Sequence, residues 1–448
     1  MRQTRDTVFI AVLILSVIAS TSLAILTATG AFFAPGGTSV TVVGGGTAGA
    51  TPGSSGSSGS SGSAGGPGGG QTNGVTGGTI TVGAIYSESG GIDATVEQHT
   101  VEACFNYYNA QGGINGHKLR LVSYDDNLNA NNAYNDAVRL DAQDHVFAIV
   151  GWLAPFGEAS AAPYFESKGI PIVGGLGVPQ EFGSPYSFPV SPIFQTDGYA
   201  FGAYATNPGG PLKFKHPGVF VTQTAGIQDF IDGIKQGAAR NGVSISNNDI
   251  VQVSFAAPQP TFQGYLAQFQ ADGVDGLITQ IDPFSYTRLY AAEEGNRHIF
   301  PHLGGAGLDK QSVDAAIGQP LNGTYGFMPY LEAQGNPGGN GEVGLYNSVA
   351  SAYIRTKSND SPANMDAFSE GSWVACRVFA QALAKLGPNV TRQGLVQALN
   401  SGTYSTGGMA PDFNWGASGG SHAAANAASF IEFTGGRWVI VQSFAPIR

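Results

Sequence analysis

The stretch "VFAIVGWLAPFGEASAAPYFESKGIPIVGG" covers residues 146–175 and decides the fold. An apolar run over residues 146–151 predicts a buried strand, residues 156–168 predict a helix, and residues 170–175 predict the next strand. Parallel strands need a crossover connection that is usually a helix. The stretch therefore predicts a β-α-β unit with parallel strands.

The same alternation continues on both sides of this stretch. Before it, strands are predicted over residues 79–86 and 117–126 and helices over residues 93–111 and 130–144. After it, the predicted strands are 218–222, 250–255, 274–280 and 298–305, and the predicted helices are 226–242, 261–271, 284–294, 341–355, 364–387 and 391–400. The last segment, residues 428–442, predicts a β-hairpin. The fold class is α/β, with two doubly wound parallel-sheet lobes.

The globular region begins near residue 79 and ends at residue 448. About 370 residues exceed the size at which a single core keeps growing, so two lobes are expected. We expect lobe 1 to comprise about 79–190 plus 331–405, and lobe 2 about 191–330 plus 406–448. Hinge segments are expected where the chain crosses between lobes, at residues 186–196, near 325–331 and near 402–412.

Residues 1–34 are apolar after a short basic start, with Arg2 and Arg5 before an apolar run over residues 8–26. A helix over that run would be about 28 Å long, close to a bilayer core, and the basic flank orients it with its start in the cytoplasm. An uncleaved signal anchor and a cleaved signal peptide both fit. Either one exports the globular region, to a membrane-anchored position or to a secreted or periplasmic one.

Residues 35–78 are rich in Gly and Ser and predict a disordered linker. As a flexible coil, the linker would have an r.m.s. end-to-end distance of roughly 35–40 Å, enough for a tethered domain to leave the membrane surface and return. The alternative is a spacer across a cell wall without a docking role.

The net charge of −11 and the absence of Lys/Arg runs argue against a nucleic-acid partner. No nucleophile motif, phosphate-binding loop or zinc-helix motif occurs, and the seven His have no metal-ligand spacing, so we expect no enzyme, no metal and no cofactor. His99, His117, His145 and His216 are interpreted as surface residues. Asp125 and Asp126 are interpreted as a turn that caps a strand.

Open parallel sheets bind ligands at the carboxyl ends of their strands, so the loops there are the candidate site. They are residues 86–91, 151–156, 174–178, 222–227, 280–283 and 304–307. Their mixture of Gly, apolar and a few polar residues is typical of a pocket for an apolar body with a few hydrogen bonds. An alternative assigns Trp152 and Phe156 to the core of the first lobe.

The only two cysteines, Cys104 and Cys376, each share a helical face with apolar residues. In an exported protein they are a disulfide candidate, and the alternative is two buried, inert thiols.

The segments "VGAIYSESGG" (82–91), "NAQGGINGHKLRLVSYDDN" (109–127) and residues 146–175 resemble the leucine/isoleucine/valine-binding proteins. These are type I periplasmic binding proteins, the substrate-binding proteins of ABC transporters. The resemblance implies two lobes that close on a small-molecule ligand across three crossovers. It also implies delivery of that ligand to ABC permease membrane subunits.

The resemblance also assigns positions to an amino-acid site. The serine that holds the ligand carboxylate corresponds to Pro155, and a backbone group and a threonine correspond to Leu176 and Val178. In the second lobe, a tyrosine falls near Ile227, the acidic residue for the ammonium near Ala306, and another tyrosine near Asp282. Taken with the strand-end loops, the ligand-binding candidates are Tyr86, Glu88, Trp152, Ala154, Pro155, Phe156, Leu176, Val178, Thr222, Gln223, Thr224, Ile227, Asp282 and Ala306.

These departures argue against a branched-chain amino acid, because both of its charges need partners in a closed cleft. Pro155 offers neither a hydroxyl nor an N–H group, and Val178 offers no hydroxyl. Asp282, Glu88 and Glu158 remain as carboxylates for an ammonium. We expect an ABC importer's solute-binding protein that captures an amino acid, an amide or, preferably, an apolar or aromatic acid or amide. The alternative is a ligand-sensing ectodomain that acts through a partner receptor.

Overall fold

The computed structural model describes residues 73–254, 262–331, 333–334 and 341–447, all within one compact unit. The predicted N-terminal helix and the linker up to residue 72 lie outside these residues. Among the described residues, no helix is both long and apolar enough to cross a bilayer. The predicted linker ends earlier than residue 78, because β1 (Val75–Thr76) pairs antiparallel with β2 (Thr79–Tyr86).

The first sheet of the described chain has six strands, and all pairings except that of β1 are parallel. Its order is β1-β2-β4-β5-β6, and β3, which is not in this series, also pairs with β2. Its remaining strands are β3 (Lys118–Asp125), β4 (Ile149–Val150), β5 (Ile172–Val173) and β6 (Ser187–Phe188). Seven consecutive residues of β2, from Ile80 to Tyr86, are buried, as expected for a parallel strand covered on both faces.

The second sheet has seven strands in the order β13-β12-β11-β10-β9-β7-β8. Strands β7 to β11 are parallel, and the C-terminal hairpin adds two antiparallel strands at one edge. The strands are β7 (Pro217–Thr222), β8 (Ile250–Val253), β9 (Gly276–Gln280), β10 (His302–Gly304), β11 (Tyr325–Met328), β12 (Ala427–Thr434) and β13 (Arg437–Pro446). The sheet of the second lobe is therefore mixed, because the predicted hairpin adds its two antiparallel strands to the parallel ones.

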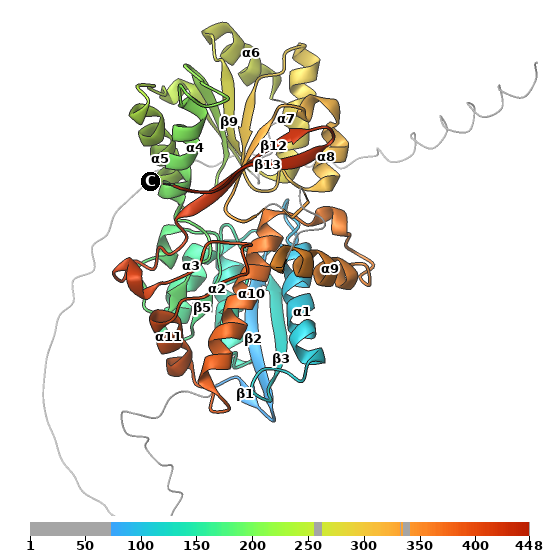
Figure 1. Ribbon diagram of the computed structural model, residues 1–448, viewed down its shortest axis with the longest axis vertical. Coiled ribbons are helices and arrows are strands. Elements are labelled where there is room, and N and C mark those ends of the chain that lie inside the picture. The colour runs from blue at the N-terminus through green and yellow to red at the C-terminus, as the bar shows by residue number, and fades with distance from the viewer. Residues whose placement is uncertain (1–72, 255–261, 332, 335–340, 448) are drawn as a thin grey trace, which may run out of the picture. The chain divides into compact units, whose positions relative to one another are not determined.

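Helices flank both sheets (Figure 1). Around the first sheet lie α1 (Thr95–Ala110), α2 (Ala130–Ala142), α3 (Glu158–Ser167), α9 (Glu342–Ile354), α10 (Ala367–Leu386) and α11 (Arg392–Ser401). Around the second lie α4 (Phe194–Thr206), α5 (Ile227–Arg240), α6 (Gln263–Asp272), α7 (Pro283–Asn296) and α8 (Gln311–Ile317). The predicted α/β class with two parallel-sheet lobes is confirmed.

Helices α4 and α5 approach each other unusually closely. A Cβ on Gly198 or Gly202 would lie 2.0 Å from the carbonyl oxygen of Phe230 or Ile234 on α5. Glycine is therefore required at both positions, and it fixes the position of α4 beside the strand ends of the second sheet.

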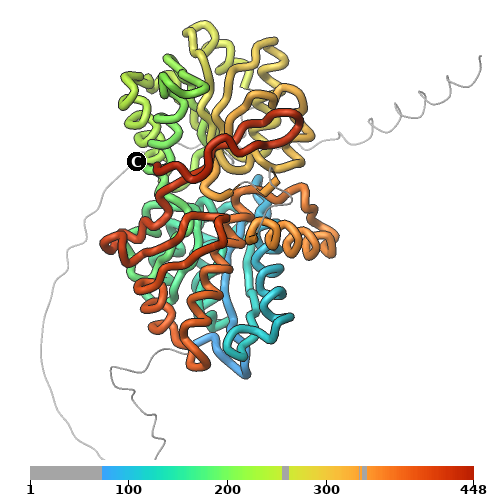
Figure 2. The backbone as a smooth tube through the Cα atoms, in the orientation of Figure 1, coloured from blue at the N-terminus to red at the C-terminus, as the bar shows by residue number. Residues whose placement is uncertain are grey.

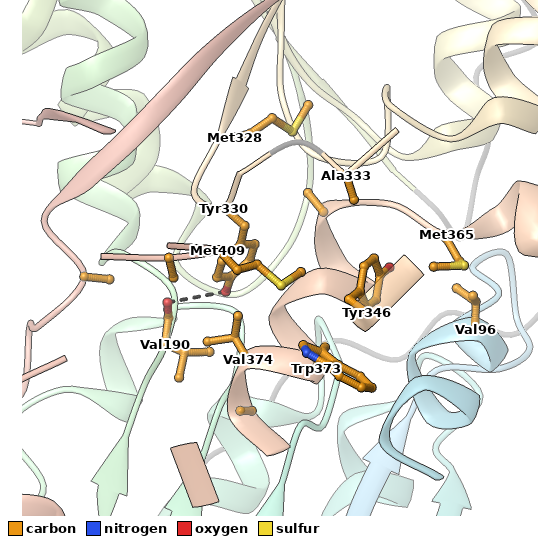
Figure 3. Packing of buried hydrophobic residues seen from close by; sticks show 14 of the residues in the cluster. Val96, Val190, Met328, Tyr330, Ala333, Tyr346, Met365, Trp373, Val374 and Met409 are labelled. Atoms are coloured by element: carbon orange, nitrogen blue, oxygen red, sulfur yellow. Dashed lines mark hydrogen bonds between the residues drawn. The ribbon is translucent and has the colours of Figure 1, made fainter. Parts of the chain in front are cut away.

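The chain passes between the two sheets three times, as the tube in Figure 2 allows the reader to follow. The passages lie between β6 and α4, between β11 and α9, and between α11 and β12. The Tyr330 hydroxyl donates to the carbonyl oxygen of Val190 at 3.3 Å, and the Leu331 amide donates to that of Met409 at 2.7 Å. Figure 3 shows Tyr330, Val190 and Met409 packed together, so the three passages lie against one another.

Two local predictions were wrong. His99 is buried, with 5% of its surface exposed, and its Nδ1 lies 2.8 Å from Asp360, so it is not a surface residue. The predicted strand over residues 146–151 is too long, because the regular strand β4 covers only Ile149–Val150 and the amide of Val146 donates to Leu140 at the end of α2. Phe147 and Ala148 still bond to β2, and Gly151 bonds to β5. The interpretation of Asp125 and Asp126 as a turn is confirmed, since each accepts a backbone N–H two residues further on.

Cys104 on α1 and Cys376 on α10 form a disulfide with their Cα atoms 6.5 Å apart. The two cysteines are 272 residues apart in the sequence. The bond links α10, which follows the second crossover passage, to α1 of the first lobe. Both cysteines are fully buried among apolar side chains.

Removing this cross-link should destabilise the protein. The Cys104→Ser/Cys376→Ser double variant should lose about 2–4 kcal/mol of unfolding free energy, because a long loop becomes free in the unfolded chain. Denaturant titration of the oxidised protein and the double variant measures the difference. Equal midpoints and slopes would contradict a structural role for the bond.

Candidate functional site

A cavity of about 520 Å³ lies where the strand ends of the two sheets face each other. Its lining comes from the segments that follow β2, β4, β5 and β6 in the first sheet and β7, β9, β10 and β11 in the second, together with the start of α10. The volume is within the range of small-molecule sites, and the location matches the rule for open parallel sheets.

The wall of the cavity is mainly aromatic and aliphatic. From the first sheet's side come Trp152, Leu153, Leu176 and Phe368, and from the second come Phe194, Phe201, Ile227, Phe230, Ile281, Phe284, Val313 and Phe327. Tyr330 lies in the wall, and its hydroxyl also donates to Val190 on another of the three crossover passages.

Eight of the predicted ligand-binding residues line this cavity. They are Trp152, Pro155, Leu176, Thr222, Thr224, Ile227, Asp282 and Ala306. Two of these already have local partners: the Asp282 amide donates to Thr222 Oγ1 at 3.0 Å, and Asp282 Oδ1 accepts from Ser285 at the start of α7. Ala306 brings no charge to the position at which the resemblance places an acidic residue.

Six predicted residues are not among the lining residues: Tyr86, Glu88, Ala154, Phe156, Val178 and Gln223. Tyr86, Ala154 and Val178 are fully buried in the first lobe, and burial raises the pKa of the Tyr86 hydroxyl well above its ordinary value. Glu88 is half-buried beside Asp125, to which its amide donates. Gln223 is exposed.

Glu158, at the start of α3, uses its carboxylate within the first lobe. Its Oε1 accepts from the Ala154 amide at 3.1 Å, and its Oε2 accepts from the Leu176 amide at 2.9 Å. It is fully buried. Glu158 therefore bonds to the loops after β4 and β5. It is not available as the partner of a ligand ammonium, the role for which it was a candidate.

Glu181 binds the loop after β5 in the same manner. Its Oε2 accepts from the amides of Gly177 and Val178 at 2.8 and 3.1 Å, and it is also fully buried. Burial and the nearby Glu181 raise the pKa of Glu158 well above its ordinary value, and burial raises the pKa of Glu181 to about 7. Because burial disfavours two negative charges here, we expect the two carboxyls to retain a proton between them. We call Glu158 and Glu181 the carboxyl pair.

The consequence for the site is a shortage of donors on the first lobe's side. The Leu176 and Val178 amides are bonded to the carboxyl pair, Val178 is buried, and Pro155 has no N–H group. None of the three positions that the resemblance assigns to the ligand carboxylate offers a free donor.

Charged residues gather at one side of the cavity. Lys310 and Glu97 line it, and Lys310 Nζ lies 3.3 Å from Asp366 Oδ2 at the start of α10. Burial raises the pKa of Glu97 well above its ordinary value. Although burial opposes it, the charges of Asp366 and Glu97 raise the pKa of Lys310, so Lys310 stays cationic and paired.

Several lining residues were missed from the sequence, among them Glu97, Ser191, Asp197, Lys310 and Tyr330. Glu97 and Asp197 lie on helices, whereas only loops were searched. Lys310 follows β10 by a few residues, so a longer strand-end window would have included it. The spacing of Phe194, Asp197 and Phe201 on one helical face was the available signal for α4.

The described residues contain no group of three or more His, Cys, Asp or Glu placed to hold a metal ion. The lining side chains instead suit hydrophobic contacts with a few hydrogen bonds.

The chain belongs to the periplasmic binding protein family, whose model matches residues 79–437. Members of this family are solute-binding proteins that work outside the cytoplasm, and they are not enzymes. A comparison with curated protein sequences finds no match.

Solved structures share the fold. A fatty acid ABC transporter substrate-binding protein from Thermomonospora curvata has 16% identity and a TM-score of 0.70, over 84% of this chain and 94% of its own. An ABC transporter solute-binding protein from R. palustris in complex with benzoate has 18% identity and a TM-score of 0.65, over 82% and 97%.

A branched-chain amino acid transporter substrate-binding protein from Streptococcus pneumoniae, in complex with isoleucine, has 17% identity and a TM-score of 0.63, over 81% and 99%. These matches confirm the predicted resemblance at the level of family and fold.

The carboxyl pair predicts a pH dependence of stability. A carboxyl whose pKa is raised in the folded state stabilises it below the unfolded pKa, and that stability is lost as pH rises through the folded pKa. In Glu181→Gln, the amide oxygen still accepts from Gly177 and Val178, and the NH₂ group can donate to Glu158.

Between pH 5 and pH 8 the unmodified protein should therefore lose about 1–3 kcal/mol more unfolding free energy than Glu181→Gln, measured by denaturant titration. Glu294→Gln, at an exposed site on α7, should behave like the unmodified protein. An identical loss in the unmodified protein and Glu181→Gln would contradict the shared proton.

Proposed function

We propose that this protein is the extracytoplasmic solute-binding subunit of an ABC importer, tethered through its N-terminus, which captures a small, mainly apolar organic molecule and delivers it to permease subunits. The observation that carries the proposal is the cavity of about 520 Å³ with an aromatic and aliphatic wall at the strand ends of both sheets. Proteins of related fold that bind benzoate or isoleucine, or that serve a fatty acid transporter, support the capture of a small organic molecule.

Closure of the lobes is the proposed mechanism. We take lobe 1 as about residues 79–190 plus 331–405, and lobe 2 as about 191–330 plus 406–448. Direct bonds then join the lobes beside the cavity: Lys310 to Asp366, the Ala367 amide to Asp309 at 2.8 Å, and the Ala225 amide to Pro155 at 3.4 Å. A ligand that touches both walls favours the closed form by its differential affinity for that form, and permeases would recognise this shape.

Pro155, Trp152, Leu176, Thr222, Thr224, Ile227, Asp282 and Ala306 are the predicted residues that we retain as ligand contacts. They supply apolar area and a few hydroxyl or carboxylate oxygens, but no anion-binding donors on the first lobe. A free amino acid would bury its carboxylate without a partner there, at a cost of several kcal/mol.

Calorimetry with leucine, isoleucine and valine should accordingly show no tight binding. Submicromolar affinity for any of the three would contradict the proposed class of ligand. Weak binding is expected because the first lobe offers no free donor for the ligand carboxylate. The result should therefore be the same for all three amino acids, whatever their side chains.

A neutral apolar probe, 4-phenylbutan-1-ol, should bind and raise the melting temperature. Ala306→Trp should abolish this shift by filling the cavity, whereas Ala315→Trp, exposed on α8 and outside the cavity lining, should keep it. A shift that survives in Ala306→Trp would place the apolar site elsewhere.

A further inference from the structure

The face of α4 that lines the cavity carries one carboxylate between aromatic rings. Phe194 lies three residues before Asp197 and Phe201 lies four residues after it, so the three side chains share a helical face. All three line the cavity. Phe230 of α5 joins them, with its ring centroid 6.3 Å from that of Phe194 and 5.2 Å from that of Phe201.

Asp197 lacks a partner in this setting. Its Oδ1 is buried and has no hydrogen bond, and burial raises the pKa of the carboxyl well above its ordinary value. An unsatisfied buried oxygen of this kind costs free energy that a bound cation or donor would recover. Among the described residues that line the cavity, the only Lys or Arg is Lys310, and it is paired with Asp366.

The rings around Asp197 favour a cation as the missing partner. Aromatic faces attract cations, and the attraction reaches about 2 kcal/mol where water is excluded. The nearby Tyr330 hydroxyl is bonded to Ser191 and Val190, so it is not free to donate to Asp197.

We propose that Asp197 and the rings of Phe194, Phe201 and Phe230 bind a protonated amine, so that the imported solute is an apolar amine. This inference rests on the proposed function, because it concerns the solute of the same cavity. The amine would donate to Asp197 Oδ1 while its carbon skeleton packs against the remaining apolar wall.

An anionic solute fits the same cavity poorly. Asp93, Glu97, Asp197 and Asp282 line it, against the single paired Lys310. The backbone amides of Leu176 and Val178, which could otherwise receive a carboxylate, are bonded to the carboxyl pair. A carboxylate would therefore meet several acidic groups and few free donors.

Three probes with one carbon skeleton test the inference: 4-phenylbutylamine, 4-phenylbutan-1-ol and 4-phenylbutanoate, titrated by calorimetry into the full-length protein at neutral pH. The amine should bind about tenfold or more tightly than the alcohol, and the acid most weakly. In Asp197→Asn the amine should lose this advantage, while the affinity for the alcohol changes by less than about twofold.

Asp232→Asn is the matched control, because it removes an exposed carboxylate of α5 in the same lobe without touching the cavity. It should keep the full preference for the amine. Melting temperatures of both variants show whether each remains folded.

The outcomes separate the two proposals. If the acid or the alcohol binds as tightly as the amine, or if Asp197→Asn keeps the preference, the inference fails while apolar-solute binding stands. If no probe binds, the proposed function fails, and the inference fails with it.

Discussion

The hydrogen bonds from the lobe 1 loops to Glu158 and Glu181 are the constraint on which the site depends. Loops after parallel strands present free N–H groups, and such groups attract anions. Here the amides of Ala154 and Leu176 donate to the buried carboxyl of Glu158, so they are not available to a ligand anion. Position 175 must be glycine, because a Cβ there would lie 1.8 Å from Glu181 Oε1. The backbone φ of Gly175 is also +113°, which side-chain-bearing residues rarely adopt. The loops are thereby fixed and present mainly carbon to the cavity.

The second lobe supplies the chemistry that the first one lacks. Close packing of α4 on α5 through Gly198 and Gly202 places the Asp197 face of α4 at the strand ends. The crossover passages join this wall to the first lobe through Tyr330, which lines the cavity and bonds to Val190 of another passage. The disulfide between Cys104 and Cys376 anchors α10, whose first residues meet Asp309 and Lys310 across the cavity. The proposed ligand contacts and the proposed closure of the lobes therefore involve some of the same residues.

The sequence predicted the strand order along the chain and the edge at which the cavity lies, because strands end where apolar runs end and parallel strands end together. Trp152, Pro155 and Ile227 were found in this way. Tyr86 and Val178 were assigned to the same loops but point into the lobe, since a loop position does not determine side-chain direction. Glu97 and Asp197 were missed because they lie on helices, outside the loops that were searched. Lys310 was missed because the segment searched after β10 was too short.

The central claim is that the lobes enclose an apolar solute with a basic group and without a carboxylate. The most direct test is native mass spectrometry of the full-length protein purified from its own cells under mild conditions, followed by release and identification of any bound molecule. The account predicts a protein-bound small molecule with an apolar skeleton and a protonated amine. A bound branched-chain amino acid or a bound carboxylic acid would contradict it.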